Sequence, residues 1–490
     1  MINITNDRIN FNNLEEKMWK IKMQEGIDEL KTQLRKIDFY ILKHKDNNCL
    51  KVKDFQETTI KCRFGDVKIF RRRYILNKHD GSKEYVYLLD KYLEFGNFGQ
   101  FSQSIVELVM KEVVEKSYRK AAESIRNVTN LSITHNSARK ILLDVVEKKI
   151  KPLEQRKLEL YEKGFIEGIR EKEIIFEESD GIFIARQKKN RTKKEKGIKL
   201  SKEAKIAIIH EGFEKRYTND FKIKNKQIIA TFDSAKRLKK LVDMTIGTTY
   251  AVHKLKKIII NADGAGWCKS IAESPIERYQ LDMFHIQKKI REAIKNPEYL
   301  KLMSDIVKTD KPKDIFNVIY NYKVELDYDK KIEELKKVEE LEKYLRNNQE
   351  GLLRYQYDLG YNFNELDMNV ETEFRNLGTE ESQVYSCCRK RMKKNRTSWS
   401  DDGAEGMIKS ICYVKNNELD NLISGELEKK LEMELNSRIP QPIKIKKIKY
   451  GNLRNVTKRV IADNLGNFSR LMLKGLLREK SFNEMRLIGD

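Results

Sequence analysis

Two aspartates in this sequence lie where a carboxylate could bind a divalent cation. Asp180 occurs in ESDG and Asp263 in NADG, and each follows an apolar run typical of a strand and precedes a glycine. A carboxylate at a strand end, next to a small residue, can point into an open site, and carboxylate oxygens are ligands that Mg²⁺ prefers. Because Asp-Gly is also an ordinary turn dipeptide, the two motifs carry weight only if one sheet brings them together.

A two-metal site for phosphoryl transfer needs a third carboxylate. Such a site holds two cations about 4 Å apart, one activating the nucleophile and the other stabilising the leaving oxygen. Three glutamates lie on or beside predicted helices further along the chain, namely Glu380 and Glu381 in GTEESQV and Glu405 in WSDDGAEGM. Residue spacing alone does not choose between them.

The elements that must position the two aspartates are the strands of residues 173–263. EIIFEESDGIFIARQ predicts a strand, an acidic turn and a second strand, and KIAIIHEGF and KQIIATF predict two more. A helical stretch runs from Ser234 to Thr245, and the three isoleucines ahead of Asp263 predict a strand buried on both faces. These patterns predict a mixed α/β sheet.

The segments on either side of this sheet predict further regions. Residues 13–45 have the apolar spacing of an amphipathic helix, and residues 58–89 alternate like a small β-hairpin unit. Residues 270–370 are Lys- and Glu-rich and helical, which predicts an α-helical insertion. A basic helix RKRMKKNR, an apolar helix around Met407 and a basic stretch IKIKKIKYGNLRNVTKR follow.

Residues 102–149 predict helices with a turn near residues 129–132. Ser132 or Thr134 would cap the second helix of this pair. Thr134, Asn136 and Arg139 at its start could reach base edges, as the recognition helix of a helix-turn-helix does, although a helix pair with a polar outer face is also common.

The charge balance predicts a polyanionic partner. The 490 residues include 99 Lys and Arg against 75 Asp and Glu, a formal net charge of +24. The basic run from Arg186 to Lys205 is either a nucleic-acid contact or a solvated hairpin tip. The 6 prolines exclude a collagen-like or Pro-rich chain, and the 6 cysteines, without a CxxC pair, argue against a zinc finger or disulfide framework.

No apolar run is long enough to span a membrane, and the N-terminus lacks the order of a signal peptide. We therefore expect a soluble cytoplasmic protein, associated with the nucleoid and without a membrane partner.

The order of the motifs resembles the DDE transposases of bacterial insertion sequences. ESDG is followed by NADGAGW, LDMFHI, GTEESQV and RKRMKKNRTSWSDDGAEGM, and the family we identify is the ISLre-two insertion-sequence family, which is similar to the Mutator-like transposases. FGDVKIFRRRYI and YVYLLD resemble that family's strand region, and SYRKAAESI resembles its helix-turn-helix. The resemblance spans residues 55–415.

This resemblance implies a ribonuclease H-like catalytic core with a mixed sheet, interrupted before its last helix by an all-α insertion. An Asp, Asp, Glu triad would bind two Mg²⁺ ions, for which Mn²⁺ can substitute. Carried onto this sequence, the triad is Asp180, Asp263 and Glu381. The adjacent Glu380 leaves the register of the glutamate open by one residue, and Glu405 remains a third choice.

The resemblance also singles out residues around the triad. Asp282 and His285 form a DxxH that resembles the (C/D)xxH signature of the Mutator-like group, and they would orient substrate or fix the first insertion helix. Trp267 and Trp399 could stack on an unpaired base or pack in the core. The basic residues expected to hold the DNA backbone are Lys188, Lys189, Arg191, Lys193, Lys194, Arg389, Lys390, Arg391, Lys393, Lys394 and Arg396.

The implied function is that of a DNA transposase that binds the ends of an insertion sequence, cleaves DNA with the aid of a metal and joins the freed strand to target DNA. Its partners would be double-stranded DNA and further copies of itself. A nuclease with the same core but no strand transfer, and an inactive transposase-derived DNA-binding regulator, remain alternatives. The predicted regions are an N-terminal helix (1–55), a β-hairpin (56–100), a helix-turn-helix (101–165), the core (166–270 and 373–425), the α-helical insertion (271–372) and a basic C-terminal region (426–490).

Overall fold

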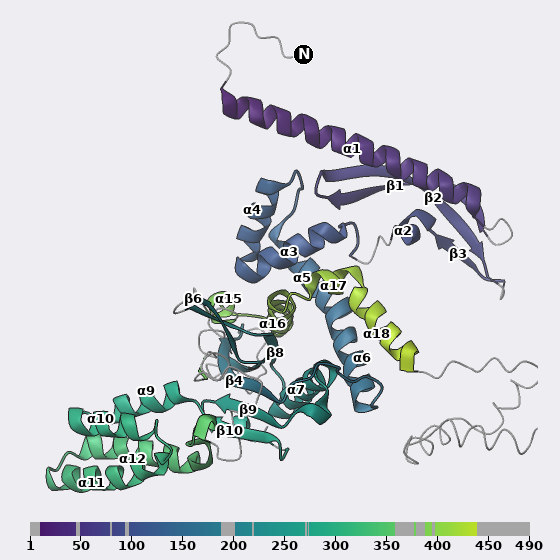
Figure 1. Ribbon diagram of the computed structural model, residues 1–490. Coiled ribbons are helices and arrows are strands. Elements are labelled where there is room, and N and C mark those ends of the chain that lie inside the picture. The colour runs from purple at the N-terminus through teal and green to yellow at the C-terminus, as the bar shows by residue number, and fades with distance from the viewer. Residues whose placement is uncertain are drawn as a thin grey trace, which may run out of the picture. The chain divides into compact units, whose positions relative to one another are not determined.

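The computed structural model describes most of the compact unit Met1–Arg438, and the second unit, Ile439–Asp490, lies outside the described residues. The predicted basic C-terminal stretch falls in that second unit. The described residues are 10–45, 50–78, 81–93, 98–187, 201–217, 220–269, 272, 274–357, 377–378, 388–393 and 397–438. Figure 1 labels their helices and strands.

Five strands form the central sheet, in the order β10-β9-β4-β5-β8. β4 is antiparallel to β5, and β5 to β8, whereas β4, β9 and β10 are parallel. The predicted mixed α/β sheet is therefore confirmed. The bounds are β4 Ile174–Ala185, β5 Ser201–His210, β8 Gln227–Thr231, β9 Lys257–Ala262 and β10 Glu277–Leu281, with a separate small hairpin of β6 Phe213–Tyr217 and β7 Asp220–Ile223.

The acidic turn predicted at Asp180 is wrong, because β4 runs through it as one continuous strand. β5 pairs with β4 from Phe176 to Ala185, so the backbone of Asp180 and Gly181 has strand partners and needs no turn. The parallel neighbour β9 pairs with β4 only as far as Ser179. Asp180 is therefore inside one ladder and just past the end of another.

Helices cover both faces of the sheet. On one face α7 packs Leu238, Val242 and Ile246 against Ile175 and Ala207. The opposite face, which includes Ile182 and Ile206, shares one core with the helices before β4 and after the insertion. The helices of this shared core are α3 Gln103–Glu115, α4 Tyr118–Val128, α5 His135–Val145, η1 Val146–Ile150, α6 Lys151–Glu162, α15 Lys390–Met392, α16 Asp401–Lys415, α17 Leu419–Ser424 and α18 Glu426–Arg438. The helices between β8 and β10 in sequence are α7 Ala235–Thr249, η3 Val252–Lys254 and α8 Gly266–Lys269.

The segment predicted as an all-α insertion begins with a strand. β10 occupies Glu277–Leu281 and pairs with β9, so the prediction of helix from residue 271 is wrong there. The polar residues of β10 are as common on the surface of a helix as in a strand. Pairing with the neighbouring strand β9 is what makes this segment a strand. Four helices that follow share a separate core, namely α9 Met283–Ala293, α10 Pro297–Ile306, α11 Ile315–Tyr328 and α12 Ile332–Asn347, and they lie together in Figure 1. The short helices of this segment are η4 Pro312–Asp314, η5 Gln349–Gly351 and η6 Tyr355–Tyr357.

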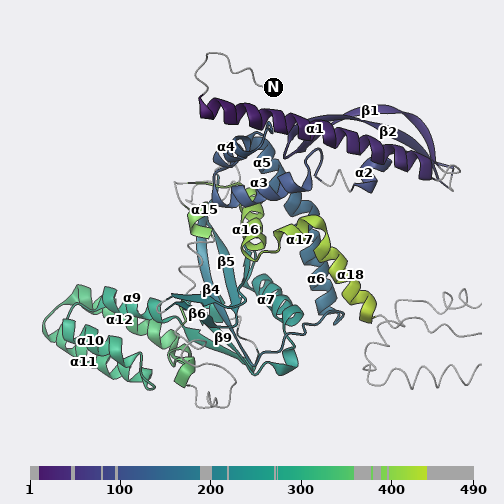
Figure 2. The same cartoon turned by 45° about the horizontal axis from the view of Figure 1, so that its top comes forward.

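A long helix and a β-sheet form the N-terminal part. Ile27, Leu34 and Ile41 of α1 pack against Val67 and Ile69 of β2, and both views show α1 lying along the hairpin (Figures 1 and 2). The predicted hairpin is extended by a third strand. The bounds are α1 Phe11–His44, β1 Leu50–Cys62, β2 Gly65–Asn77, β3 Lys83–Val86 and α2 Leu88–Tyr92.

Each helix of the α4–α5 pair begins at a side-chain cap. Ser117 accepts the N–H of Lys120 at 3.3 Å, and Thr134 accepts the N–H of Ser137 at 3.1 Å. Thr134, rather than Ser132, is therefore the cap of α5.

No helix in the described ranges is both long and apolar enough to cross a membrane.

Candidate functional site

Asp180 and Asp263 come together at the point where β4 and β9 part. The last pair of this parallel ladder is Ser179 with Ala262, and each aspartate is the next residue on its own strand. Phe176 and Ile259 pack in one cluster, so alternation along the two strands places both carboxylates on that same face. Strand pairing therefore brings the two candidate aspartates together in one sheet, as the sequence argument required.

The carboxylate of Asp180 is buried and electrostatically coupled to its surroundings. Burial raises its pKa above the ordinary value, the N–H of Gly181, which donates to Oδ1 at 2.7 Å, lowers the pKa, and the charge of Asp263 raises it further. Electrostatic interactions with Arg389 and His285 lower the pKa of Asp180. Two candidate residues from distant parts of the sequence therefore act on this carboxylate.

Asp263 is held by the turn that follows β9. Its Oδ1 accepts the N–H of Ala265 at 2.9 Å, and its backbone carbonyl accepts the hydroxyl of Tyr344 from α12 at 2.8 Å. Gly264 has φ +88°, and a Cβ there would lie 2.9 Å from Leu281, which explains the glycine of NADG. The buried thiol of Cys268 lies 3.7 Å from Oδ1, and burial together with the two aspartates raises the pKa of that thiol.

A buried glutamate and a buried histidine form a pair near the two aspartates. Glu178, two residues before Asp180, accepts the N–H of Gly378 at 2.9 Å and lies 3.1 Å from Nε2 of His210. The other ring nitrogen, Nδ1, accepts the N–H of Gly212, so Nε2 carries the proton and donates to Glu178. Sequence reasoning missed Glu178 and His210, although the spacing of Glu178 and Asp180 in FEESDG places them on one strand face.

Asp282 caps α9 and fixes the position of His285. Its Oδ1 accepts the N–H of His285 at 3.0 Å, and its Oδ2 accepts the side-chain amide of Asn261 at 3.0 Å. Burial raises the pKa of Asp282, and the nearby Glu178 adds to the shift. The DxxH spacing thus places a helix cap at its first residue and a half-buried imidazole at its last, close enough to act on Asp180.

The third carboxylate is not placed by the structure. Glu380 and Glu381 lie outside the described residues, and Glu405 pairs with Lys151 at 3.7 Å. Across the described ranges, no group of three His, Cys, Asp or Glu residues could hold a metal ion. Asp180 and Asp263 still fit a divalent cation, because they are adjacent oxygen donors of like charge, and a cation would relieve their repulsion.

The residues predicted to contact DNA have different environments. Thr134 is engaged as a cap, while Asn136 and Arg139 are exposed on the first turns of α5. Lys188, Lys189, Arg191, Lys193, Lys194, Lys394 and Arg396 lie outside the described residues.

The basic helix predicted from RKRMKKNR is short in the described residues, with α15 covering only Lys390–Met392. Lys393 is exposed, whereas Lys390 pairs with Glu115 at 3.5 Å. The guanidinium of Arg391 packs against Tyr118 and Trp399. Arg391 is thus engaged in packing within the unit.

The two tryptophans also differ. Trp399 is buried in the main core, and its indole N–H donates to the carbonyl of Met392 at 3.0 Å, which is the packing role anticipated as an alternative to base stacking. Trp267 is half-buried on α8, its indole N–H donates to Glu203 at 3.3 Å, and Lys205 lies 5.9 Å from its ring centroid.

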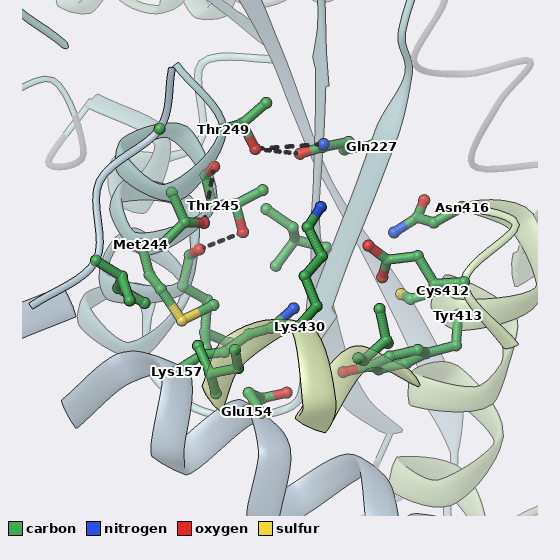
Figure 3. A pocket seen from close by; sticks show the side chains of 18 of the residues that line it. Glu154, Lys157, Gln227, Met244, Thr245, Thr249, Cys412, Tyr413, Asn416 and Lys430 are labelled. Carbon is green, nitrogen blue, oxygen red and sulfur yellow. Dashed lines mark hydrogen bonds between the residues drawn. The ribbon is translucent and has the colours of Figure 1, made fainter. Parts of the chain in front are cut away.

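A cavity of about 610 Å³ lies beside the edge strand β8, between α6, α7, α16 and α18 (Figure 3). It is lined by none of the residues predicted for the site. Lys157 and Lys430 are among its lining side chains, and Gln227 and Thr249 are hydrogen-bonded at its rim. At its far wall, the amide of Asn416 binds the N–H and the carbonyl of Ile228 and thereby occupies the open edge of β8.

Comparison with known proteins gives the family of the chain. A UPF0236 protein of Caldanaerobacter subterraneus subsp. tengcongensis, whose name joins eleven locus designations, is 24% identical over 426 residues, covering 85% of this chain and 78% of that protein. A UPF0236 protein of Streptococcus gallolyticus, named for the region 3′ of vanSb, is 24% identical over 317 residues, covering 60% of this chain and 64% of its own length. The family described as "Uncharacterised protein family (UPF0236)" matches residues 4–430, and the chain therefore belongs to UPF0236.

Proposed function

We propose that this protein is a DNA transposase of the ISLre-two type, which binds the ends of an insertion sequence and catalyses metal-dependent strand cleavage and strand transfer. The observation that carries the proposal is the adjacency of Asp180 and Asp263 where the parallel strands β4 and β9 part. Adjacent carboxylates on one face of a sheet are the oxygen donors that Mg²⁺ requires, and metal-assisted phosphoryl transfer is the reaction that such a site serves on DNA.

The arrangement of the elements supports the same proposal. Three antiparallel strands followed by two parallel ones, with the helices α9–α12 inserted after the last strand, are what we expect of the interrupted ribonuclease H-like core that the resemblance implies. The helix pair α4–α5, with Asn136 and Arg139 exposed, is a candidate helix-turn-helix on the same core. The net charge of +24 favours a polyanionic substrate.

The relatives add an independent argument. A name that joins eleven locus designations describes one protein encoded many times in a genome. Repeated copies of one gene are what an element that moves by transposition leaves behind. This argument concerns the relative, and it favours the transposase over the regulator for this chain.

In the proposed site the chain's own residues have separate roles. Asp180 and Asp263 would hold the ions, and Asp263 is oriented for this by the N–H of Ala265. Bound Mg²⁺ would supply the Lewis acid that stabilises charge on the transferring phosphoryl group. Arg389, whose positive charge acts on Asp180, would offset part of the negative charge that the carboxylates and a DNA phosphate bring together.

We assign the third carboxylate to Glu381, with Glu380 as the neighbouring choice. Gly378, which Glu178 binds through its N–H, is three residues earlier, and three residues of extended chain span about 10 Å. The proposal rests on this sequence position, three residues after a glycine that contacts Glu178. Glu405 is disfavoured because it pairs with Lys151 on α6.

The test is a cleavage and joining assay on duplex DNA that flanks the gene, with Mg²⁺ or Mn²⁺. Asp180→Asn, Asp263→Asn and Glu381→Gln should bind this DNA and fail to cut it. The exposed residues Asp310 and Glu340 provide matched controls, and Asp310→Asn and Glu340→Gln should remain active.

Three outcomes would change the proposal. Activity of Glu381→Gln with loss of activity in Glu380→Gln would move the register by one residue. Cleavage by the wild type without joining would favour the nuclease, and binding without cleavage under either metal would favour the regulator.

A further inference from the structure

The short helix α15 lies between the α4–α5 pair and the strand that carries Asp180. On one side, the guanidinium carbon of Arg391 lies 5.4 Å from the ring centroid of Tyr118, the first residue of α4, and 4.9 Å from that of Trp399. Its Nε donates to the carbonyl of Val113 on α3 at 2.7 Å. Arg391 thus touches both helices at the turn between α3 and α4.

Trp399 continues this contact to β4. Its backbone N–H donates to the carbonyl of Ala185, the last residue of β4, at 2.9 Å, and its carbonyl accepts the N–H of Gln187 at 2.8 Å. Its indole N–H donates to the backbone carbonyl of Met392 on α15. The ring on which Arg391 stacks is therefore fixed to the strand that contains Asp180.

The residue at the start of α15 interacts electrostatically with the candidate catalytic site. Arg389 directly precedes the helix, and its charge acts on the Asp180 carboxylate. Cys388 and Met392 on either side are fully buried in the main core. A rotation or shift of α15 would therefore move Arg389 and Arg391 together.

A second tie joins α15 to the same end of α3. The carboxylate of Glu115 forms ion pairs with the ammonium groups of Lys415 on α16, at 2.5 Å, and of Lys390, at 3.5 Å. These contacts lower the pKa of Glu115. The end of α3 is thus held against α15 by the hydrogen bond from Arg391 to Val113 and by an ion-pair cluster.

A packing role alone explains Arg391 poorly. Burial lowers its pKa, and no carboxylate of the described residues forms a salt bridge with it. Arg391 is half-buried, and partly desolvating a charge in this way is unfavourable compared with an apolar side chain of the same size. The planar guanidinium offers what an apolar chain lacks, which is stacking on two rings with a directed hydrogen bond to α3.

We infer that Arg391 is a positioning residue that couples DNA binding on α4 and α5 to the aspartate pair through α15. The inference rests on the proposed function, since it takes Asp180 and Asp263 as the metal ligands and α4–α5 as the DNA-binding pair. Such coupling is reciprocal, so bound DNA should tighten metal binding by the same factor by which metal tightens DNA binding.

The experiment measures Mn²⁺ affinity of the full-length protein by titration, with and without a duplex taken from the DNA that flanks its gene. In the wild type we expect the duplex to tighten Mn²⁺ binding about tenfold. In Arg391→Met and Arg391→Lys that factor should fall to about one, while Mn²⁺ affinity without DNA changes less than about twofold. Arg35→Met, which removes an exposed arginine of α1, should keep the tenfold factor.

Tyr118 supplies a second pair of variants in case Arg391→Met does not fold. Its hydroxyl is buried without a hydrogen-bond partner, so Tyr118→Phe keeps the stacking face and should keep the coupling. Tyr118→Leu removes the ring and should abolish the coupling.

Coupling that persists in Arg391→Met and Tyr118→Leu, or that is absent in the wild type although both ligands bind, would overturn the inference and leave the proposed function standing. Wild-type protein whose Mn²⁺ binding is unaffected by Asp180→Asn and Asp263→Asn would overturn the proposed function, and the inference with it.

Discussion

Asp180 and Asp263 are neighbours because Ser179 and Ala262 are the last paired residues of the parallel β4–β9 ladder. Beyond this pair the two strands part, and the two carboxylates lie on the face shared by Phe176 and Ile259. Their charges interact, and the charge of Asp263 contributes to the raised pKa of Asp180. This relationship is the basis of the proposed metal site and of the predictions that follow.

Glu177 should make the protein less stable as the pH rises. Burial raises its pKa from 4.5 to about 7, and its Oε2 has no hydrogen-bond partner. Because the folded-state pKa is the higher one, the folded protein binds more protons between pH 4.5 and 7, and stability falls as pH increases through that window. Glu177→Gln should remove this dependence and stabilise the protein by about 3 kcal/mol at pH 8.

Urea unfolding at pH 5 and pH 8 checks this prediction. The difference between wild type and Glu177→Gln should grow with pH, whereas Glu340→Gln, at an exposed position on α12, should follow the wild type at both values. A difference that is the same at pH 5 and pH 8 would contradict the assigned pKa.

Gly378→Ala should impair the proposed site more than the fold. Gly378 has φ +125°, and a Cβ there would lie 3.1 Å from Oδ2 of Asp282, so alanine should cost about 1–3 kcal/mol. Its N–H also donates to Glu178, two residues before Asp180, so a shift at this point disturbs the proposed site. DNA cleavage should therefore fall by more than the loss of folded protein explains.

Gly81→Ala is the matched control for this glycine. Gly81 also has a positive φ, +80°, but a Cβ there would meet nothing within 4 Å. It should lose stability to a similar degree and keep its specific cleavage rate. Equal specific rates in the two variants would argue against a role for Gly378 in the site.

Arg139 and Asn136 should contribute differently to DNA binding. Removing one phosphate contact with Arg139→Ala should reduce the slope of log affinity against log salt by about one. Asn136→Ala should cost about 1–3 kcal/mol on its preferred site and little on unrelated DNA. Titrations at several salt concentrations measure both effects, with Lys336→Ala on α12 as the control. A salt slope unchanged by Arg139→Ala would exclude a phosphate contact at that residue.

Asn416→Leu should destabilise the edge of the sheet. The Asn416 amide binds the N–H and carbonyl of Ile228 at 2.8 and 3.0 Å, and leucine would leave both strand groups without these partners. The expected loss is about 2 kcal/mol in urea unfolding. Asn421→Leu, at an exposed position on α17, should cost far less, and equal losses would show that the edge contact contributes little.

Local patterns in the sequence determined which elements form and where several of them begin. The apolar runs before Asp180 and Asp263 predicted strands, Thr134 was one of two residues predicted to cap α5, and the alternation of residues 58–89 predicted paired strands. These features depend on neighbours within a few residues of one another. For the same reason the candidate aspartates could be chosen before their partners were known.

Only the tertiary structure decided which of these residues meet. β10 is a strand because β9 lies beside it, and Asp180 sits within a strand because β5 pairs through it. Glu178, His210 and Gly378 come from three separate segments, and Arg391 stacks on rings from α4 and from the chain before α16. Contacts between residues distant in sequence depend on register and packing, which the periodicity of any single segment does not contain.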